Sequence, residues 1–405
     1  MKPIVRAGRM KPVHSDIRGP LFVEAMKRQK QGIDILKLNT GNPATFGFGL
    51  PDSIKNALME HMQDGIGYCD FKGMPQARQA ICDYETSKGI KGITSDDVFI
   101  GNGVSEVVSF ALTPLLNDGD EVLVPSPSYS LWGNSVYLED GKSVFYTCDE
   151  QANWYPDIQD IRSKITDKTK AIVIINPNNP TGVLYPKELL LEIIQIARES
   201  GLLIFADEIY DRLVMDGKQH ISLASLTEDV PVITLNGLSK SHCLCGYRCG
   251  WMVISGPREL TEDYRQGIIQ LTSLRLCANT LAQIVIPAAL DDMDTPASMV
   301  RPGGRIYEQR EATVRELEKI DGLSFVKNDA AFYVFPKLDV KKFNITNDKQ
   351  FAHDLLDATN ILLVPGSGFD WKDPDHFRIV MLPQADILSD AIRRMGTFLD
   401  GYKQK

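Results

Sequence analysis

A series of short, continuously apolar runs alternates with helix-like stretches through the first two thirds of the chain. Parallel strands have this continuous apolar character because helices cover both faces of their sheet. Alternation of such strands with helices predicts an α/β architecture. The predicted strands lie at residues 97–100, 121–124, 171–175, 202–206, 232–235 and 251–254, and one of the helices lies at 187–199.

The pattern changes after about residue 291, where a long polar helix is predicted over 305–319. Short apolar runs follow it, which is typical of an α+β segment, at residues 323–326, 331–335, 362–364 and 377–380. A chain of 405 residues is long enough for two cores. We therefore predict an N-terminal arm that joins part of the small domain (1–50), a large domain (51–291) and a small C-terminal domain (292–405).

One lysine follows a predicted strand in a suggestive setting. Lys240 comes shortly after the run at 232–235, and Arg248 lies eight residues later. A lysine that forms a Schiff base with an aldehyde cofactor needs a well-held backbone and a nearby cation for the cofactor's anionic group. The segment supplies both, although a single lysine beside a turn is most often a solvated surface charge.

Two more polar sites follow strand ends. Asn179 lies in the Pro- and Gly-rich stretch after the run at 171–175, and Asp207 ends the run at 202–206. Proteins of the α/β class bind ligands at the carboxyl ends of their strands. A carboxylate there can keep a pyridine nitrogen protonated, which makes the ring an electron sink. An ordinary turn and a helix cap are the structural alternatives.

Asn179, Asp207, Lys240 and Arg248 occur in this order, each at or after a predicted strand end. With these motifs the chain resembles the fold-type I pyridoxal-phosphate enzymes, specifically the class I and II aminotransferases, over nearly its whole length. Within them it is most similar to the bacterial glutamate–pyruvate (alanine) aminotransferases. Three stretches carry this closer similarity, at residues 16–20, 67–70 and 236–240. The resemblance implies a large domain with a mostly parallel seven-stranded sheet flanked by helices, a small α+β domain, and a homodimer.

The resemblance also implies a site for pyridoxal 5'-phosphate. Lys240 would form the Schiff base and then move a proton as base and acid. Asp207, rather than Glu208, would pair with the ring nitrogen. Tyr129 would stack on the ring, with Trp132 as an alternative. The remaining positions matched to cofactor contacts are Asn179 and Tyr210 at the ring hydroxyl, and Gly103, Val104, Ser105, Ser239, Arg248 and the partner subunit's Tyr68 at the phosphate.

The substrate's α-carboxylate would meet Arg378, whose planar fork suits bidentate binding better than a lysine. The resemblance adds Gly41 and Asn179 to this part of the site. A second carboxylate, on glutamate, needs a second cation. Arg18 is the preferred candidate, and Arg275 is the alternative, one residue out of register with the arginine that dicarboxylate-specific relatives use.

The implied reaction is ping-pong transamination between L-alanine/pyruvate and L-glutamate/2-oxoglutarate. Aromatic, branched-chain or valine–pyruvate transamination remains open, as does β-elimination of sulfur amino acids, because one fold serves many reactions. A metabolite-sensing regulator would need a basic DNA-binding segment, which the chain lacks. A net charge of −9 likewise gives no footprint for nucleic acid.

The remaining features predict a cytoplasmic protein. The basic N-terminus is followed by no apolar stretch, and no run approaches the roughly 20 apolar residues of a membrane span. The 7 cysteines have no framework spacing, as in a reducing compartment. Cys243, Cys245 and Cys249 crowd the lysine, but their spacing does not match a zinc site, so we predict no metal.

Overall fold

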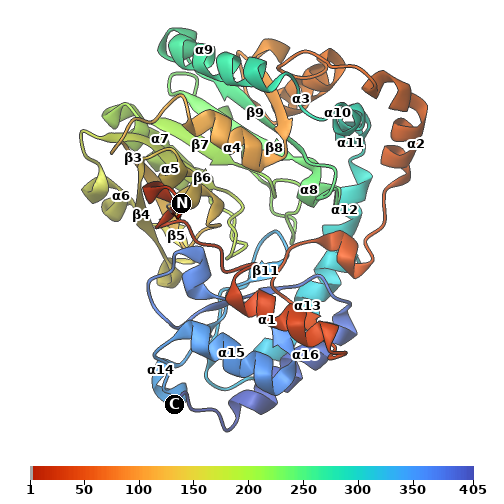
Figure 1. Ribbon diagram of the computed structural model, residues 1–405, viewed down its shortest axis with the longest axis vertical. Helices are drawn as coiled ribbons and strands as arrows, with labels where there is room; N and C mark the ends of the chain where they lie inside the picture. The colour runs from red at the N-terminus through yellow and green to blue at the C-terminus, as the bar shows by residue number, and fades with distance from the viewer. Residues whose placement is uncertain (1–2) are drawn as a thin grey trace.

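The computed structural model describes residues 3–405, and a large sheet dominates its upper part (Figure 1). Its strands follow the order β2-β9-β8-β7-β6-β3-β4-β5. The four central pairings, from β8 to β4, are parallel, while β9 runs antiparallel to both β2 and β8. Seven strands thus form the predicted, mostly parallel sheet, and β5 adds a two-residue antiparallel edge. The strands are β2 (Val98–Asn102), β3 (Glu121–Ser126), β4 (Lys142–Asp149), β5 (Tyr155–Pro156), β6 (Thr169–Ile175), β7 (Leu203–Asp207), β8 (Val232–Gly237) and β9 (Cys249–Ser255).

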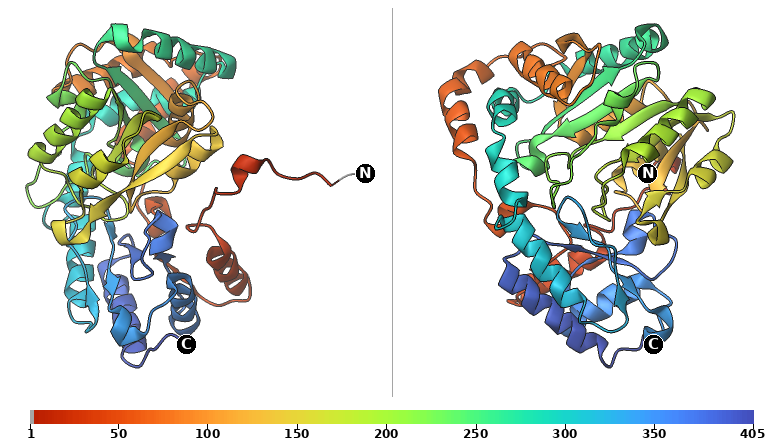
Figure 2. Two further views of the ribbon diagram at one scale, coloured as in Figure 1. Left: turned by 90° about the vertical axis from the view of Figure 1, so that its left-hand side faces the viewer. Right: turned by 180° about the vertical axis from the view of Figure 1, so that it is seen from behind.

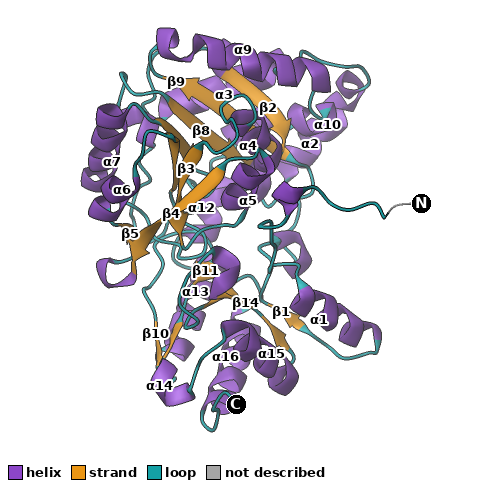
Figure 3. Cartoon of the chain, turned by 60° about the vertical axis from the view of Figure 1, so that its left-hand side comes forward, coloured by secondary structure: helices purple, strands orange, loops and turns teal. Residues whose placement is uncertain are grey.

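Helices cover both faces of this sheet, and Figure 3 shows them on either side of the strands. Strand β6 is apolar from Ala171 onward because its two faces pack in two different cores. Val173 packs in one core with α4 and α5, whereas its neighbours Ile172 and Ile174 pack in a second core with α6 and α7. A third core joins β2 and β9 to helices at the far end of the sheet. The helices of this large lobe are α2 (Asp52–His61), α3 (Pro75–Ser87), α4 (Val104–Leu112), α5 (Leu131–Leu138), α6 (Ile158–Lys164), α7 (Lys187–Ser200), α8 (Leu238–Ser241), α9 (Arg258–Arg275), α10 (Thr280–Ile284) and α11 (Ile286–Asp291).

A small lobe holds the C-terminal part of the chain and has its own apolar core. Its strands form one three-stranded sheet, β11-β15-β14, and two pairs, β1-β13 and β10-β12. The helices of this lobe and its connection are α1 (Pro20–Lys30), α12 (Asp294–Val300), α13 (Arg305–Leu317), α14 (Val340–Phe343), α15 (Asp348–Thr359) and α16 (Ala385–Leu399). Its strands are β1 (Leu36–Lys37), β10 (Leu323–Ser324), β11 (Tyr333–Val334), β12 (Lys337–Leu338), β13 (Ile361–Leu362), β14 (Val364–Pro365) and β15 (Phe377–Val380).

The N-terminal segment connects the two lobes. Strand β1 pairs in parallel with β13 of the small lobe, and α1 lies beside α15. The preceding residues extend away from the small lobe, as the left view of Figure 2 shows. They reach α5, where the amide of His14 donates to Asn134 and Arg9 pairs with Asp140. The arm therefore contacts both lobes, and the domain boundaries at residues 50 and 291 stay predictions.

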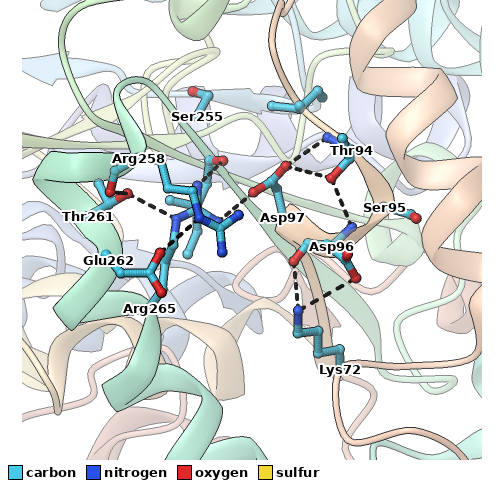
Figure 4. Close-up of polar contacts among 12 residues, drawn as sticks. Lys72, Thr94, Ser95, Asp96, Asp97, Ser255, Arg258, Thr261, Glu262 and Arg265 are labelled. Carbon is cyan, nitrogen blue, oxygen red and sulfur yellow. Dashed lines mark hydrogen bonds and ion pairs between the residues drawn. The ribbon is translucent and has the colours of Figure 1, made fainter.

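A buried ion pair ties α9 to the start of the large sheet (Figure 4). Arg265 donates to Asp97 at 2.6 Å and to the Ile254 carbonyl on β9 at 3.0 Å. Its Nε also donates to Thr261, one turn earlier in α9. A buried pair with these additional hydrogen bonds fixes the helix orientation more than it adds stability.

The structure confirms the strands predicted from the apolar runs, except that the run at 362–364 divides at Leu363 into β13 and β14. The strands of the small lobe are only two to four residues long. Strand β4 was missed because its residues are buried only in part. Within residues 3–405 no single helix is long and apolar enough to cross a membrane. The pair α9 and α10–α11 passes by combined length and composition, but it is bent by 120°.

Candidate active site

The parallel strands of the large lobe end at one edge, and that edge carries the polar residues singled out in the sequence. Asp207 ends β7, Asn179 follows β6, and Lys240 lies on α8 directly after β8. Helix α8 lies at the edge of the large sheet nearest the small lobe (Figure 1). Arg378, on β15 of the small lobe, donates to Asn179 at 2.9 Å, so residues from both lobes meet here.

Asp207 is buried beneath this edge and holds a hydrogen bond that the sequence analysis did not predict. Trp132 is fully buried against Phe205, and its indole N–H donates to the Asp207 carboxylate at 3.0 Å. Burial raises the pKa of Asp207 to about 6, and the Trp132 hydrogen bond opposes this rise. Trp132 therefore lies under the carboxylate, whereas Tyr129 is 37% exposed and remains the better candidate for stacking.

Replacing Asp207 by asparagine tests this burial through the pH dependence of stability. The pKa rises from 3.8 to about 6 on folding, so ionisation costs the fold nothing below about pH 4 and the full penalty above about pH 6. The neutral Asp207→Asn variant should be more stable than the cofactor-free parent by up to about 3 kcal/mol near pH 8. Urea unfolding of both proteins near pH 4 and near pH 8 measures the difference in their free energy of unfolding. An equal gain in stability at the two pH values would contradict the raised pKa of Asp207.

The Glu208 carboxylate points away from that of Asp207, toward Lys88. It accepts hydrogen bonds from the Ser222 hydroxyl at 2.9 Å and the Leu223 amide at 3.0 Å, and it lies 2.7 Å from the Lys88 ammonium. These partners satisfy it within the large lobe. The preference for Asp207 over Glu208 as the ring-nitrogen partner is therefore consistent with the geometry.

Lys240 lies half-buried between the two lobes. Its ammonium donates to the Gly41 carbonyl at 2.9 Å and lies 3.8 Å from the Cys245 sulfur. Burial alone would lower the pKa of Lys240, but the acidic groups of Tyr333, Cys245 and Tyr129 raise it overall. No carboxylate forms an ion pair with this lysine in the part of the chain that the structure describes. The amine is thus protonated but held only by weak neutral partners.

The N-terminus of α4 forms a cradle with Arg248. Arg248 donates to the Ser105 hydroxyl at 3.1 Å. Gly103 has a positive φ of 85°, and a Cβ there would lie 2.2 Å from the Arg248 guanidinium, so only glycine permits this approach. The first amides of the helix, at Val104 and Ser105, have no partner four residues earlier within the helix. Free amides, the helix dipole and a guanidinium together suit a phosphate.

Arg378 is a buried cation with neutral partners. Its guanidinium lies 4.6 Å from the ring centroids of both Tyr333 and Phe369, and it also donates to the Asn39 carbonyl. Its Nε is buried without a hydrogen-bond partner. Across residues 3–405 no carboxylate pairs with it. A buried guanidinium with an unused N–H is arranged for an anionic ligand.

Tyr333 is the main site residue that the sequence analysis missed. Its hydroxyl lies 2.9 Å from that of Tyr210, and a Cβ on Gly41 would meet it at 2.3 Å. The predicted run at 331–335 indicated a strand but not that one of its side chains faces the other lobe. Tyr210, Gly41 and Tyr333 therefore converge where sequence alone had named only the first two.

The candidates at the rim of the site differ in their contacts. Arg275 donates to Glu106 at 2.6 Å and to two backbone carbonyls, so its charge is already paired. Arg18 is exposed and lies next to Ile17, whose carbonyl accepts from the Asn39 side chain at 2.8 Å. Because Asn39 also contacts Arg378, the arm that carries Arg18 lies beside the buried arginine.

Two further candidates lie apart from these contacts. Tyr68 is 84% exposed, and its side chain makes no hydrogen bond with the residues that the structure describes. Ser239 precedes Lys240, and its carbonyl accepts from the Cys245 thiol at 3.0 Å.

The cysteines near Lys240 contact different groups. Cys249 donates to the Ala282 carbonyl at 2.8 Å, and burial raises the pKa of Cys243 to about 12. Among residues 3–405 these cysteines belong to no cluster with metal-ligand spacing. Two such clusters occur elsewhere: Glu24, His353 and Asp357, and Glu208, Asp211 and His220.

A helix-flanked sheet with a lysine, a buried aspartate and a glycine–arginine cradle at its edge defines a class of enzyme. The family model for class I and II aminotransferases matches residues 33–392, and the chain belongs to this family. Enzymes of this family depend in general on pyridoxal phosphate.

The chain is 50% identical to a glutamate–pyruvate aminotransferase of Haemophilus influenzae, over the full length of both chains. A solved aminotransferase from Escherichia coli is 47% identical, with full coverage of both chains and a TM-score of 0.98. The alanine aminotransferase of Pyrococcus furiosus is 40% identical, with a TM-score of 0.93, covering 98% of this chain and all of that one.

The donors present fit pyridoxal 5'-phosphate. The cofactor offers a phosphate, a pyridine nitrogen and an aldehyde. The cradle of Gly103 and Arg248 suits the phosphate, since a Cβ at Gly103 would fill it. The buried Asp207 suits a protonated ring nitrogen, and Lys240 suits the aldehyde.

Proposed function

We propose that this protein transfers amino groups between L-alanine/pyruvate and L-glutamate/2-oxoglutarate, with pyridoxal 5'-phosphate as its cofactor. The names of its relatives, glutamate–pyruvate and alanine aminotransferases, support the substrates. The observation that carries the proposal is the buried Arg378, whose charge has no carboxylate partner among the described residues. Amino acids and 2-oxo acids share the α-carboxylate that this arginine would bind.

Each candidate residue then has one role toward the cofactor. Lys240 would bind its aldehyde, Asp207 its ring nitrogen, and Asn179 and Tyr210 its ring hydroxyl. Tyr129 would stack on the ring. The phosphate would be held by Gly103, Val104, Ser105, Ser239 and Arg248, together with Tyr68 of the partner subunit.

The bound cofactor supplies an electron sink that makes the substrate's α-hydrogen acidic. The chain's own residues then direct the proton. Asp207, held by Trp132, keeps the ring nitrogen protonated. With substrate bound, the Lys240 amine would be the base that takes the α-proton and then the acid that returns it. The same lysine acts in reverse when the second oxo acid binds, which gives ping-pong kinetics.

Arg378 and Gly41 hold the substrate for this transfer. The Arg378 fork binds the α-carboxylate through two parallel N–H groups, which orients the α-hydrogen toward Lys240. Asn179 already accepts one Arg378 N–H at 2.9 Å and so fixes the fork before substrate arrives. The Gly41 amide is the second carboxylate donor, with Tyr333 packed so closely that no side chain fits.

Arg18 is proposed to bind the second carboxylate of glutamate. Its replacement by Gln should raise KM for L-glutamate and 2-oxoglutarate roughly ten- to a hundredfold, since a hydrogen bond to a charged group contributes about 1.5–3 kcal/mol. KM for L-alanine should change little. Steady-state kinetics with each substrate, and with Arg9→Gln of the same arm as control, tests the assignment; equal effects on alanine and glutamate would remove it.

The protein is proposed to act as a homodimer that completes each site with Tyr68 from the partner subunit. Exposed apolar side chains support this: Ile66, Tyr68 and Leu281 are all exposed, and the backbone at Gly65 packs against Leu281. Burial of these apolar side chains against a second copy would remove them from water. Light scattering that gives the mass of a monomer at working concentrations would contradict the proposal.

Half-reaction spectroscopy tests the function itself. The purified holoenzyme is mixed with one amino acid and no oxo acid, and the visible absorbance of the bound cofactor is followed. L-alanine and L-glutamate should each bleach the band, while L-valine and L-tyrosine should not. Bleaching by aromatic or branched amino acids alone would overturn the substrates. Release of pyruvate and ammonia from cysteine would indicate a lyase, and absence of any band would overturn the proposal.

A further inference from the structure

A lysine lies buried behind the active site, directly after α3. The Lys88 ammonium lies 2.8 Å from Glu85, 2.7 Å from Glu208 and 3.1 Å from Asp211. Its side chain is 13% exposed, and each of the three carboxylates is at most 3% exposed. Removing four ionisable groups from water is unfavourable, so such a cluster calls for a reason beyond stability.

Two of these carboxylates belong to the segment that carries the cofactor residues. Along this segment Asp207 and Tyr210 face the site, whereas Glu208 and Asp211 turn toward Lys88. The amide of Asp211 also donates to the Glu208 carbonyl at 2.9 Å, which closes a tight turn. The lysine therefore holds the back of the turn whose front presents the ring-nitrogen and ring-hydroxyl partners.

The same cluster reaches the segment of the reactive lysine. Asn236, at the end of β8, donates to Asp211 at 2.7 Å, and its side-chain oxygen accepts from the Gly237 amide at 2.7 Å. Tyr84 donates to the same Asp211 oxygen at 2.6 Å. Lys240 follows Asn236 by four residues. Movement of Asp211 would therefore be transmitted to the turn that leads into α8.

Strand β9 and the loop after β6 also contact this cluster. His220 lies 3.1 Å from the carbonyl of Asn176, three residues before Asn179 on the loop after β6. The Trp251 indole, on β9, donates to Glu85 at 3.2 Å. The cluster thus contacts β8, β9 and the segments that follow β6 and β7, which carry or adjoin Asn179, Asp207, Tyr210 and Lys240.

We propose that Lys88 is a positioning residue of the active site: its ammonium holds Glu208 and Asp211, and through them the turns that present Asp207, Tyr210 and Lys240. This inference rests on the proposed transaminase function. Glu208, Asp211 and His220 also have metal-ligand spacing, but the Lys88 ammonium already lies within ion-pair distance of both carboxylates. A lysine therefore supplies the positive charge in this cluster.

The neighbouring carboxylates favour the charged form of Lys88. Burial opposes the ammonium, but Glu208, Glu85 and Asp211 together hold the pKa of Lys88 well above its usual value. Burial also raises the pKa of Glu85, which favours its neutral form and reduces the excess of negative charge. The ion pairs of Lys88 therefore hold the surrounding turns in place.

Lys88→Met in the full-length holoenzyme tests the proposal, because it keeps the length of the side chain and removes the charge. We expect kcat to fall about ten- to a hundredfold, with KM for L-alanine changed less than about threefold, since small displacements of catalytic groups have effects of this size. The pH midpoint of the bound cofactor's absorbance should also shift. Lys91→Met is the matched control: Lys91 is 70% exposed and pairs only with Glu228 at the surface.

Tyr84→Phe is a second, milder variant that should still fold, because it removes only the Tyr84 hydroxyl that donates to Asp211. It should lower kcat roughly two- to fivefold and shift the absorbance midpoint in the same direction. Glu208→Gln, which keeps an acceptor for Ser222, should do likewise. Parent-like kcat and midpoint in the folded variants would overturn the proposal, as would a loss of activity that follows only the unfolded fraction. A parent enzyme without transamination would instead overturn the proposed function, while the absorbance midpoint still reports on Lys88.

Discussion

Lys240→Ala should lower the transamination rate by about 10²- to 10⁴-fold, which is the range of a lost general acid–base group. The variant keeps the phosphate cradle of Gly103 and Arg248, so it should still bind the cofactor. The variant lacks the Lys240 amine, which donates to the Gly41 carbonyl and is the base proposed to move the α-proton. Reductive trapping with borohydride, followed by peptide mass analysis, should label Lys240 in the parent and leave the variant unlabelled.

Lys164→Ala is the matched control for this experiment. Lys164 is also partly buried and also donates to a backbone carbonyl, that of Phe145, at 2.6 Å, but it lies on α6 away from the site. Its activity should equal that of the parent. A trapped label on another lysine, or a Lys240→Ala variant with more than about a tenth of parental activity, would contradict the assignment.

Arg378→Lys should lower kcat/KM for every amino acid and oxo acid by roughly 30- to 1,000-fold. The substitution keeps a positive charge but removes the planar fork that binds a carboxylate and the face that stacks on Tyr333 and Phe369. Weakening a buried charge pair costs about 2–5 kcal/mol. Most of the loss should appear in KM, because the α-carboxylate is bound in the ground state and in the transition state alike.

Arg393→Lys provides the comparison, since Arg393 lies on the surface of α16 and is 62% exposed. Steady-state kinetics with L-alanine and with 2-oxoglutarate should leave it unchanged. If Arg378→Lys affected only glutamate, the arginine would bind the side-chain carboxylate instead of the α-carboxylate, and the roles proposed for Arg378 and Arg18 would be exchanged.

The large lobe was predictable because its strands are apolar on both faces. Burial on both sides leaves a continuous apolar signal, which β6 shows from Ala171 to Ile175. Strand β4 has no such signal, since its residues alternate between buried and partly exposed positions. The short strands of the small lobe were found as apolar runs, but their pairing depends on contacts far apart in the sequence, such as β1 with β13.

Site residues could be predicted where they follow the end of a predicted strand and also match a motif of the family. Asp207 and Lys240 meet both conditions. Tyr333 was not predicted, and Trp132 was named only as an alternative stacking residue. The contacts that define their roles, with Tyr210 and Asp207, span more than 70 positions of sequence. The cluster around Lys88 was hidden for the same reason: a lysine after a helix reads as a surface charge until the fold encloses it.

The alternation of side chains along β6 has a consequence for the evolution of the site. Val173 fills one core and its neighbours Ile172 and Ile174 fill another, so a slip by one residue would exchange valine and isoleucine between two close-packed cores. The register of β6 also sets where the chain leaves the sheet and where Asn179 meets Arg378. An insertion or deletion within β6 would therefore disturb both the packing of the two cores and the position of Asn179. We expect the loops at the opposite edge of the sheet to tolerate changes in length better. Related enzymes should therefore differ in loop length at that opposite edge. At the edge that carries the site, the packing of the cores should keep the lengths of the strands constant.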